Sequence, residues 1–195
     1  MTTSTPQVEL TRTVDGLVVP APGIYDLDKA HTVIGFVARH LMVTKVRGTF
    51  GEFEGAITVA EDPAQSSVEV EIRTDSVTTG EPQRDAHLRS ADFFEQEKFP
   101  TMTFKSTSVA PAGDGSWKIT GDLTIRGVTK SVTLNTEFNG AVTDPWGGSR
   151  LGFSAWTDVN RQDFGVSFGS ALADGSVVVG DKIRIELEAE AVRRS

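Results

Sequence analysis

Cysteine is absent from this chain of 195 residues, so no disulfide can form and no thiolate can bind a metal or act as a nucleophile. Long apolar runs are absent as well, and without about 18 consecutive apolar residues a membrane-spanning helix is not expected. The N-terminus has no basic segment followed by an apolar stretch, as a secretory signal would have. We therefore expect a cytoplasmic protein with no stable membrane insertion.

Positive charge is scarce too. The chain carries 19 Lys and Arg against 27 Asp and Glu, a net charge of −8. The basic residues are dispersed, and the densest group, Arg193-Arg194, is interpreted as a solvated tail. Because binding to phosphate backbones needs clustered cations, the sequence predicts no nucleic-acid partner.

Histidine occurs only at His31, His40 and His87. None of the spacings matches two ligands on one helix face or one strand face, and no cysteine is present to assist. The sequence therefore predicts no metal site. Each ring is expected to be structural, with a hydrogen bond to the backbone or to a carboxylate.

A catalytic centre is not indicated either. Asp85, His87 and Ser90 have the composition of a hydrolytic triad, but three members within six residues of one short segment rarely reach triad geometry. Glu52 and Glu54 lie two apart on one strand face, where both are expected to be solvated and a poor acid–base pair. We expect no catalytic residues.

Apolar and polar residues alternate in a series of short runs separated by turn sequences, as in strands with one buried face. About eight such strands predict an all-β protein whose antiparallel sheet is curled into a closed barrel, with a sandwich as the related alternative. A barrel of this size can hold one ligand. The clearest runs are 32–38, 52–59, 67–75, 101–108, 117–125, 131–138, 151–159 and 183–191.

One segment, Glu81–Lys98, lacks alternation and is rich in helix-forming residues. Pro82 suits a first helical turn, and Ser90 can cap a second short helix beginning near Ala91. The segment predicts one or two short helices across an opening of the barrel, ending at Pro100. A second irregular element is expected around 162–170.

The chain is expected to form one domain preceded by an arm. Residues 1–22 are polar, end in a proline-rich turn and predict a flexible arm or an extra edge strand. Residues 23–195 carry the strand pattern and form the expected barrel domain.

Four separated motifs resemble one known family. The first is D-x-x-H-x-x-x-x-F-x-x-R-H-L-x-x-x-x-V-x-G-x-F, which begins at Asp28, and the others are Arg84–Phe104, Gly121–Lys130 and Asn160–Gly165. In this order they are similar to the YceI-like family of lipocalin-like polyisoprenoid-binding proteins. The resemblance implies a lipocalin-like barrel that binds a long isoprenoid lipid, of the prenyl quinone or prenyl phosphate type, without chemistry and without a cofactor.

If this resemblance holds, the inward-facing apolar residues line a lipid tunnel. Because small barrels are often filled by side chains, an ordinary packed core is the alternative at each position. The expected lining residues are Ile34, Phe36, Phe53, Ile57, Met102, Phe104, Leu123, Leu134 and Phe153.

Four basic residues within or beside these motifs are candidates for the mouth of the tunnel and for a lipid head group: Arg39, His40, Arg126 and Arg161. An arginine there can bind a diphosphate with two parallel hydrogen bonds. The alternative is an ion pair that fixes a loop, for example with Asp158 or Asp163.

Two other classes of function stay open. The barrel could house an enzyme for a small apolar or lipid-like substrate, although no catalytic spacing is recognised. It could also be filled with side chains and act through protein contacts, as a homodimer. A lumen that is solid or polar would exclude the lipid-binding interpretation.

Overall fold

The computed structural model describes residues 9–169 and 178–194, and strands dominate it. Over these residues no helix has the length and hydropathy to cross a bilayer. The strands are β1 (Thr11–Val14), β2 (Leu17–Pro20), β3 (Gly23–Leu27), β4 (Val33–His40), β5 (Thr44–Phe50), β6 (Phe53–Val59), β7 (Ser67–Arg73), β8 (Val77–Thr78), β9 (Thr101–Gly113), β10 (Ser116–Ile125), β11 (Val128–Thr143), β12 (Ser149–Asn160) and β13 (Lys182–Arg193).

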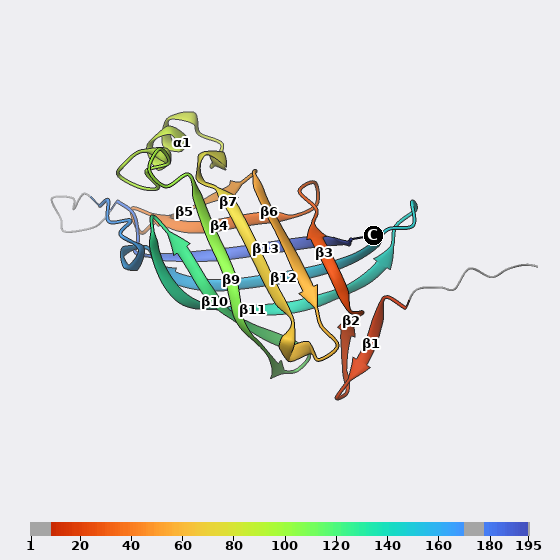
Figure 1. The fold of residues 1–195 in the computed structure, drawn as a ribbon. Coiled ribbons are helices and arrows are strands. Elements are labelled where there is room, and N and C mark those ends of the chain that lie inside the picture. The colour runs from red at the N-terminus through yellow and green to blue at the C-terminus, as the bar shows by residue number, and fades with distance from the viewer. Residues whose placement is uncertain (1–8, 170–177, 195) are drawn as a thin grey trace, which may run out of the picture.

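Eight strands close into an antiparallel barrel, which confirms the predicted fold class (Figure 1). Around the ring the order is β12-β11-β10-β9-β7-β6-β3-β13, and β13 pairs with β12 to complete it. Closure leaves the ring without an exposed edge of unpaired N–H and C=O groups. The interior is therefore surrounded by a closed ring of eight paired strands.

The wall divides at β13. Its first part, Arg184–Glu188, pairs with β4, whereas its last residues, Ala191–Arg193, pair with β3. The β4 branch continues through β5 to β8, which follows β7 in the chain after a 3₁₀ turn at Thr74–Ser76. One end of the barrel is thus enclosed by β4, β5 and β8, and the other by β3 and β6.

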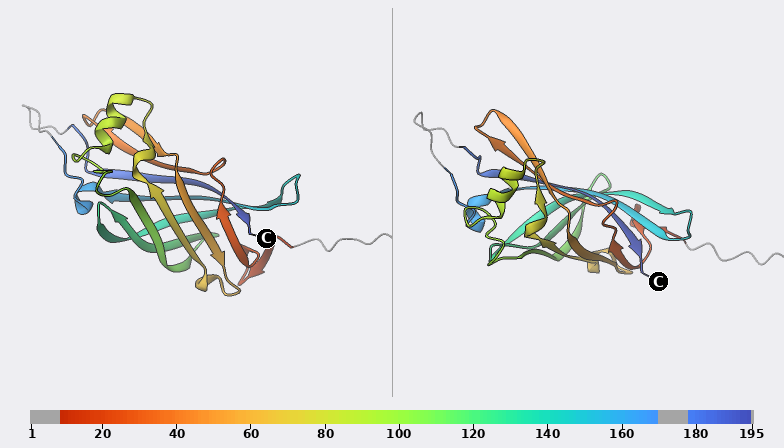
Figure 2. Two further views of the ribbon diagram at one scale, coloured as in Figure 1. Left: turned by 45° about the horizontal axis from the view of Figure 1, so that its top comes forward. Right: turned by 90° about the horizontal axis from the view of Figure 1, so that it is seen from above.

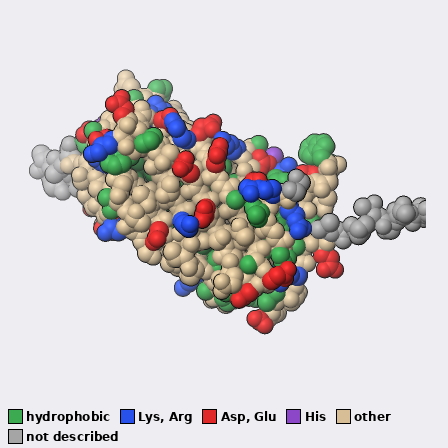
Figure 3. All heavy atoms as spheres, viewed as in Figure 1, with side chains coloured by type: hydrophobic (Ala, Val, Ile, Leu, Met, Phe, Trp, Pro, Cys, Tyr) green, Lys and Arg blue, Asp and Glu red, His purple; other side chains and the backbone are tan. Residues whose placement is uncertain are grey.

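Alternation within each strand sets which side chains face the interior. In β7, Val68, Val70 and Ile72 point inward, whereas Glu69 points outward and forms an ion pair of 2.9 Å with Lys105 of β9. Figure 3 shows acidic and basic side chains interspersed over this outer face. The period of two therefore places an apolar surface inside and a mixed-charge surface outside.

A helical cap lies over one end of the barrel (Figures 1 and 2). Its helix, α1 (Pro82–Arg89), begins at Pro82 as predicted, and the Glu81 carboxylate accepts hydrogen bonds from the backbone N–H groups of the first turn. Glu81 is thus the N-cap, and Pro82 needs no N–H partner there.

The second short helix predicted near Ala91 does not form. The chain turns back instead, and the backbone N–H groups of Phe94 and Glu95 donate to the carbonyls of Leu88 and Ser90. Glu95 has a left-handed φ of 50°, which interrupts any helix. The Ser90 hydroxyl accepts from the Asp92 N–H at 3.3 Å and donates to the His87 carbonyl at the end of α1, but only turns follow it.

The irregular element expected at 162–170 begins as the 3₁₀ helix Arg161–Phe164 and ends at Gly165, which is left-handed with φ of 71°. Residues up to Gly169 continue without a strand or helix. Residue 170 lies outside the described residues.

The N-terminal arm contains a hairpin. Strands β1 and β2 form a separate two-stranded sheet, and Arg12 donates to the carbonyl oxygen of Ala60 at 2.7 Å. Val19 of β2 is buried, and β2 lies at the end of the barrel away from α1 (Figure 1). Part of the expected arm, residues 1–8, lies outside the described residues.

The interpretation of Arg193-Arg194 as a solvated tail is wrong. Arg193 is the last residue of β13 and donates to the Pro22 carbonyl at 3.0 Å, and Arg194 forms an ion pair with Asp26. The two arginines attach the end of β13 to the start of β3, because the two strands are antiparallel.

Gly121 of β10 provides a test of this packing. A Cβ there would lie 2.5 Å from the ring of Phe104 and 2.6 Å from the Lys105 carbonyl oxygen, so Gly121→Ala forces the wall apart. We expect a loss of about 1–3 kcal/mol in the free energy of unfolding, measured by urea denaturation. Gly51→Ala is the matched control because nothing lies within 4 Å of its Cβ position. Equal stability of the two variants would contradict the packing described.

Candidate ligand-binding cavity

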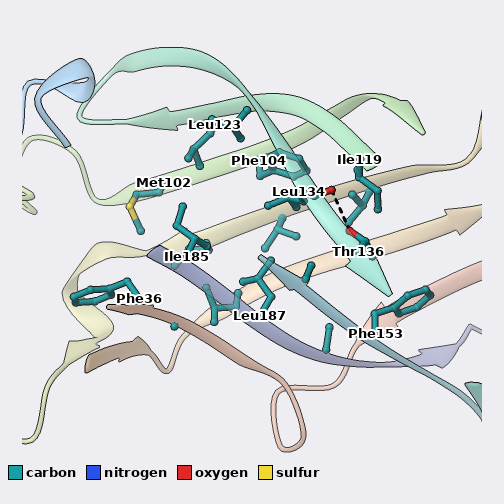
Figure 4. Close-up of a pocket in the computed structure, with 18 of the residues that line it drawn as sticks. Phe36, Met102, Phe104, Ile119, Leu123, Leu134, Thr136, Phe153, Ile185 and Leu187 are labelled. Carbon is teal, nitrogen blue, oxygen red and sulfur yellow. Dashed lines mark hydrogen bonds between the residues drawn. The ribbon is translucent and has the colours of Figure 1, made fainter. Parts of the chain in front are cut away.

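A cavity of about 320 Å³ lies inside the barrel, and side chains from nearly every strand of the wall line it (Figure 4). Eight of the nine residues expected from the sequence border it: Ile34, Phe36, Ile57, Met102, Phe104, Leu123, Leu134 and Phe153. The lumen is therefore not completely filled by these side chains. Lining residues such as Phe104 and Leu134 are nevertheless buried within the protein, with 8 % of their surface exposed.

Phe53 does not border the cavity. It is 2 % exposed and packs in a buried cluster with Phe50 of β5 and Val77 of β8. Alternation places Phe53 on the inner side, but the sequence does not show that a second branch of the sheet covers that position.

Several lining residues were not selected from the sequence. Ile185 and Leu187 of β13 follow the same alternation as the chosen residues, so the pattern contained the signal. Leu88, Phe93 and Phe94 come from the helical cap, where no periodicity marks them. Only the placement of the cap over the barrel end brings these three to the lumen.

Few polar atoms reach the cavity, and partners within the protein satisfy the central ones. Thr136 donates from its hydroxyl to the Leu134 carbonyl at 3.4 Å, drawn as a dashed line in Figure 4. Thr32 donates to the Glu190 carbonyl and accepts from the Glu190 N–H, each at 3.0 Å. A hydrocarbon can enter without stripping water from an unpaired polar group.

Arg161 borders the cavity, but its guanidinium is fully engaged by the loops around it. The residue is 5 % exposed, and its guanidinium donates four hydrogen bonds at 2.6–3.1 Å and forms one ion pair at 3.0 Å. The acceptors are the carbonyls of Val166, Phe168, Val179 and Gly180 and the carboxylate of Asp181. The loop-fixing alternative therefore describes Arg161, with Asp181 as the ion-pair partner in place of Asp158 or Asp163.

Arg126 also fixes an irregular segment, in this case the helical cap. Its guanidinium donates to the carbonyls of Ala91 and Phe93 at 3.1 and 2.8 Å and pairs with Glu95 at 2.9 Å. This fixes the turns that follow α1 to the β10–β11 corner. Arg126 does not border the cavity.

Arg39 and His40 lie at the end of β4, where both are exposed. Arg39 is paired in register with Lys45 of β5, and His40 forms an isolated β-bridge with Val179. Neither borders the cavity, although both lie at the end that α1 covers.

The residues with triad composition do not assemble into one. Asp85 accepts from the hydroxyls of Thr78 and Thr79 at 2.9 and 2.6 Å. Burial raises the pKa of Asp85, but these hydrogen bonds outweigh it and hold the pKa below its ordinary value. His87 instead contacts Asp92 at 2.7 Å.

Asp28, His31 and Glu190 form the group of possible metal ligands found among the described residues. His31 Nδ1 lies 2.8 Å from the Asp28 carboxylate, as expected for a structural histidine. Arg150 already contacts both carboxylates, and its Nε lies 2.7 Å from Asp144. A guanidinium therefore supplies the positive charge that a cation would bring.

Removing Arg161 tests its structural role. Arg161→Met leaves several buried carbonyls without donors, so we expect a loss of about 3 kcal/mol or more in the free energy of unfolding. Arg39→Met, at an exposed position, serves as the control and should change little. Thermal and urea unfolding measure both, and an unchanged Arg161→Met would contradict the assignment.

The Asp28 cluster predicts a pH dependence of stability. Hydrogen bonds from His31 and Arg150 lower the pKa of Asp28 from 3.8 to about 2. Because the folded pKa lies below the unfolded one, this stabilisation is complete above pH 3.8 and is lost as the pH falls towards 2.

We expect Asp28→Asn to be less stable at neutral pH and to show a weaker pH dependence between these values. Urea unfolding at a series of pH values measures this, with exposed Asp122→Asn as the control. The same pH profile for both variants would show that Asp28 does not contribute.

The fold and the cavity define a class, the closed lipocalin-like β-barrel with an apolar lumen. Residues 25–191 match the family of the YceI-like domain. A protein YceI of Escherichia coli is 45 % identical over 152 residues, which cover 77 % of this chain and 79 % of the relative. A UPF0312 protein of Vibrio cholerae is 38 % identical over 174 residues, or 88 % and 87 % of the two chains. The chain belongs to the YceI-like family.

Solved structures agree with this assignment. The Campylobacter jejuni YceI protein is 31 % identical with a TM-score of 0.68, over 80 % of this chain and 90 % of that one. A polyisoprenoid-binding domain from Saccharophagus degradans shares the fold with a TM-score of 0.65 at 16 % identity, over 87 % and 98 %.

Proposed function

We propose that this protein binds a long isoprenoid lipid in its barrel lumen, for storage or transport and without chemistry. The observation that carries the proposal is the cavity inside the barrel, whose lining is hydrocarbon apart from a few satisfied polar groups. Family membership supports it, as does the S. degradans neighbour described as a polyisoprenoid-binding domain.

The energetics favour a hydrocarbon chain. Each buried methylene contributes about 0.8 kcal/mol, so a few isoprene units offset the cost of ordering a flexible ligand. Because eight strands of the wall form a closed ring, the wall resists collapse onto an empty lumen. Rigid strands thus keep the apolar surface available for the ligand.

The charges around the cavity favour an uncharged head group, as in a prenyl quinone, over a prenyl phosphate. Among the described residues, Arg161 is the cation that borders the cavity, and loop carbonyls and the Asp181 carboxylate already hold its guanidinium. Arg126 fixes the helical cap. A phosphate taken into the lumen would have to displace these contacts, whereas a quinone needs no counter-charge.

The absence of chemistry is part of the proposal. His87 and Asp85 have different partners, and neither borders the cavity. An enzyme would need a reactive acid, base or nucleophile at the lumen. The polar groups of the described lining are threonine and serine hydroxyls and the Arg161 guanidinium, with no histidine or carboxylate beside them to activate a hydroxyl. The cytoplasmic location and the homodimer stay predictions, to be tested by cell fractionation and analytical ultracentrifugation.

Mass spectrometry of an organic extract from freshly purified protein tests the proposal directly. We expect a co-purified isoprenoid and saturable binding of added prenyl quinone, tighter than that of the matched prenyl phosphate. If no lipid is extracted and neither compound binds saturably, the carrier function is wrong. If the prenyl phosphate binds more tightly than the prenyl quinone, the preference for an uncharged head group is wrong, but the carrier function stands.

Filling the lumen should block binding. Ala155 of β12 borders the cavity and pairs in register with Leu187, so Ala155→Phe places a ring inside the barrel. We expect prenyl quinone affinity to fall by at least about tenfold, from a few kcal/mol of lost burial. Ser131→Phe, at an exposed position on neighbouring β11, is the control. Circular dichroism checks that both variants fold, and equal binding would place the lipid elsewhere.

A further inference from the structure

The turn between β4 and β5 exposes three consecutive large apolar side chains. Leu41, Met42 and Val43 are 36 %, 51 % and 76 % exposed. Single exposed apolar residues are common on protein surfaces, but a contiguous group at the tip of a projecting hairpin is unusual. We call Arg39–Lys45 the hairpin tip.

The backbone of the hairpin tip is strained. Leu41 and Met42 have φ of 50° and 59°, and the Val43 N–H donates to the His40 carbonyl at 3.1 Å. Hairpin turns with two left-handed residues strongly prefer Asn and Gly there. Large side chains at these positions cost stability, and such strain points to a function when the surrounding structure maintains it.

The charges of the hairpin tip are also unfavourable for the isolated protein. Arg39 and Lys45 lie directly opposite each other across β4 and β5, where like charges destabilise a strand pair. Residues 37–47 contain no acidic residue although the whole chain carries a net charge of −8. Arg47 is neutralised by Glu186 at 2.8 Å, whereas Arg39 and Lys45 form no ion pair with any acidic residue among those that the structure describes.

The hairpin tip lies beside the capped end of the cavity. The Leu41 N–H donates to the Val178 carbonyl at 2.9 Å, and the Gly180 N–H donates to the Arg39 carbonyl at 2.9 Å. Val179, between those two residues, borders the cavity, as does Ala38 in β4. Figures 1 and 2 show the β4–β5 hairpin and α1 at the same end of the barrel.

We propose that the hairpin tip docks on the surface of an anionic phospholipid bilayer. Leu41, Met42 and Val43 enter the boundary between head groups and acyl chains, and Arg39 and Lys45 contact lipid phosphates. This inference rests on the proposed carrier function, because docking turns the capped end of the lumen towards the membrane that holds the lipid.

The charge arrangement favours a bilayer over a second copy of this chain. Two hairpin tips meeting in a symmetric dimer would bring two Arg39–Lys45 pairs together, which adds repulsion. An anionic surface relieves the repulsion within each pair. The overall negative charge opposes binding at a distance, but at physiological salt it is screened beyond about 8 Å.

The cysteine-free chain allows a site-specific test. Val43→Cys and Trp146→Cys each receive an environment-sensitive fluorophore. Trp146 is 86 % exposed in the β11–β12 turn at the opposite end of β13, so it is a matched apolar control. The vesicles contain phosphatidylcholine with or without phosphatidylglycerol.

We expect the label at 43 to shift to shorter wavelength with phosphatidylglycerol vesicles, and the label at 146 to stay unchanged. No shift at 43, or equal shifts at both positions, would overturn the proposal.

Vesicle flotation of unlabelled full-length protein gives a second readout. We expect Val43→Ser and Lys45→Glu each to lower the bound fraction several-fold, and Trp146→Ser to leave it unchanged. Binding of prenyl quinone delivered in detergent should be the same in all three variants. If quinone binds normally but the protein does not float with vesicles, docking is wrong and the carrier function stands.

If neither prenyl quinone nor the matched prenyl phosphate binds, the carrier function fails whatever the flotation shows. Sedimentation without vesicles tests whether a second copy of this chain binds the hairpin tip instead. If the protein forms a dimer that Val43→Ser abolishes, and does not float with vesicles, the hairpin tip is a dimer contact and the proposal is overturned.

Discussion

The pairing of β13 is the interaction on which the rest of the structure depends. This strand bonds to β12 along its length on one side, and to β4 and then β3 on the other. It therefore closes the ring and divides the wall in the same place. The closed wall maintains an apolar lumen that would otherwise collapse, and the division makes room for the β4–β5 hairpin at the capped end. Both the cavity and the hairpin tip are consequences of this one strand.

Polar groups near the lumen are satisfied by the protein itself. Arg161 and Arg126 look like ligand-binding cations in the sequence, yet their donors meet loop and cap carbonyls. The effect is to fix the irregular segments over the barrel end with charge-assisted hydrogen bonds, which are stronger than neutral ones. The lumen keeps a hydrocarbon surface because these two guanidinium groups bind backbone carbonyls of the loops and the cap.

The sequence predicted the barrel well because alternation is a local signal, and each inward-facing residue can be identified from its own strand. It predicted the boundaries of the site less well. Phe53 faces inward as expected, but the β5–β8 branch covers it, a relation between segments about 25 residues apart in the chain. Phe93 and Phe94 reach the lumen through a cap without periodicity. The partners of Arg161 lie in loops, and no local pattern indicates that five acceptors converge on one side chain.

The order of the strands along the chain has a consequence for biosynthesis. β13 is translated after the other twelve strands, so the ring cannot close on the ribosome until Lys182–Arg193 has emerged. Until then β12 and β3 have open edges and the lumen-facing side chains are exposed to water, a state prone to aggregation. The nascent chain should therefore depend on chaperones that hold extended apolar segments, and that dependence should end once β13 has emerged and paired.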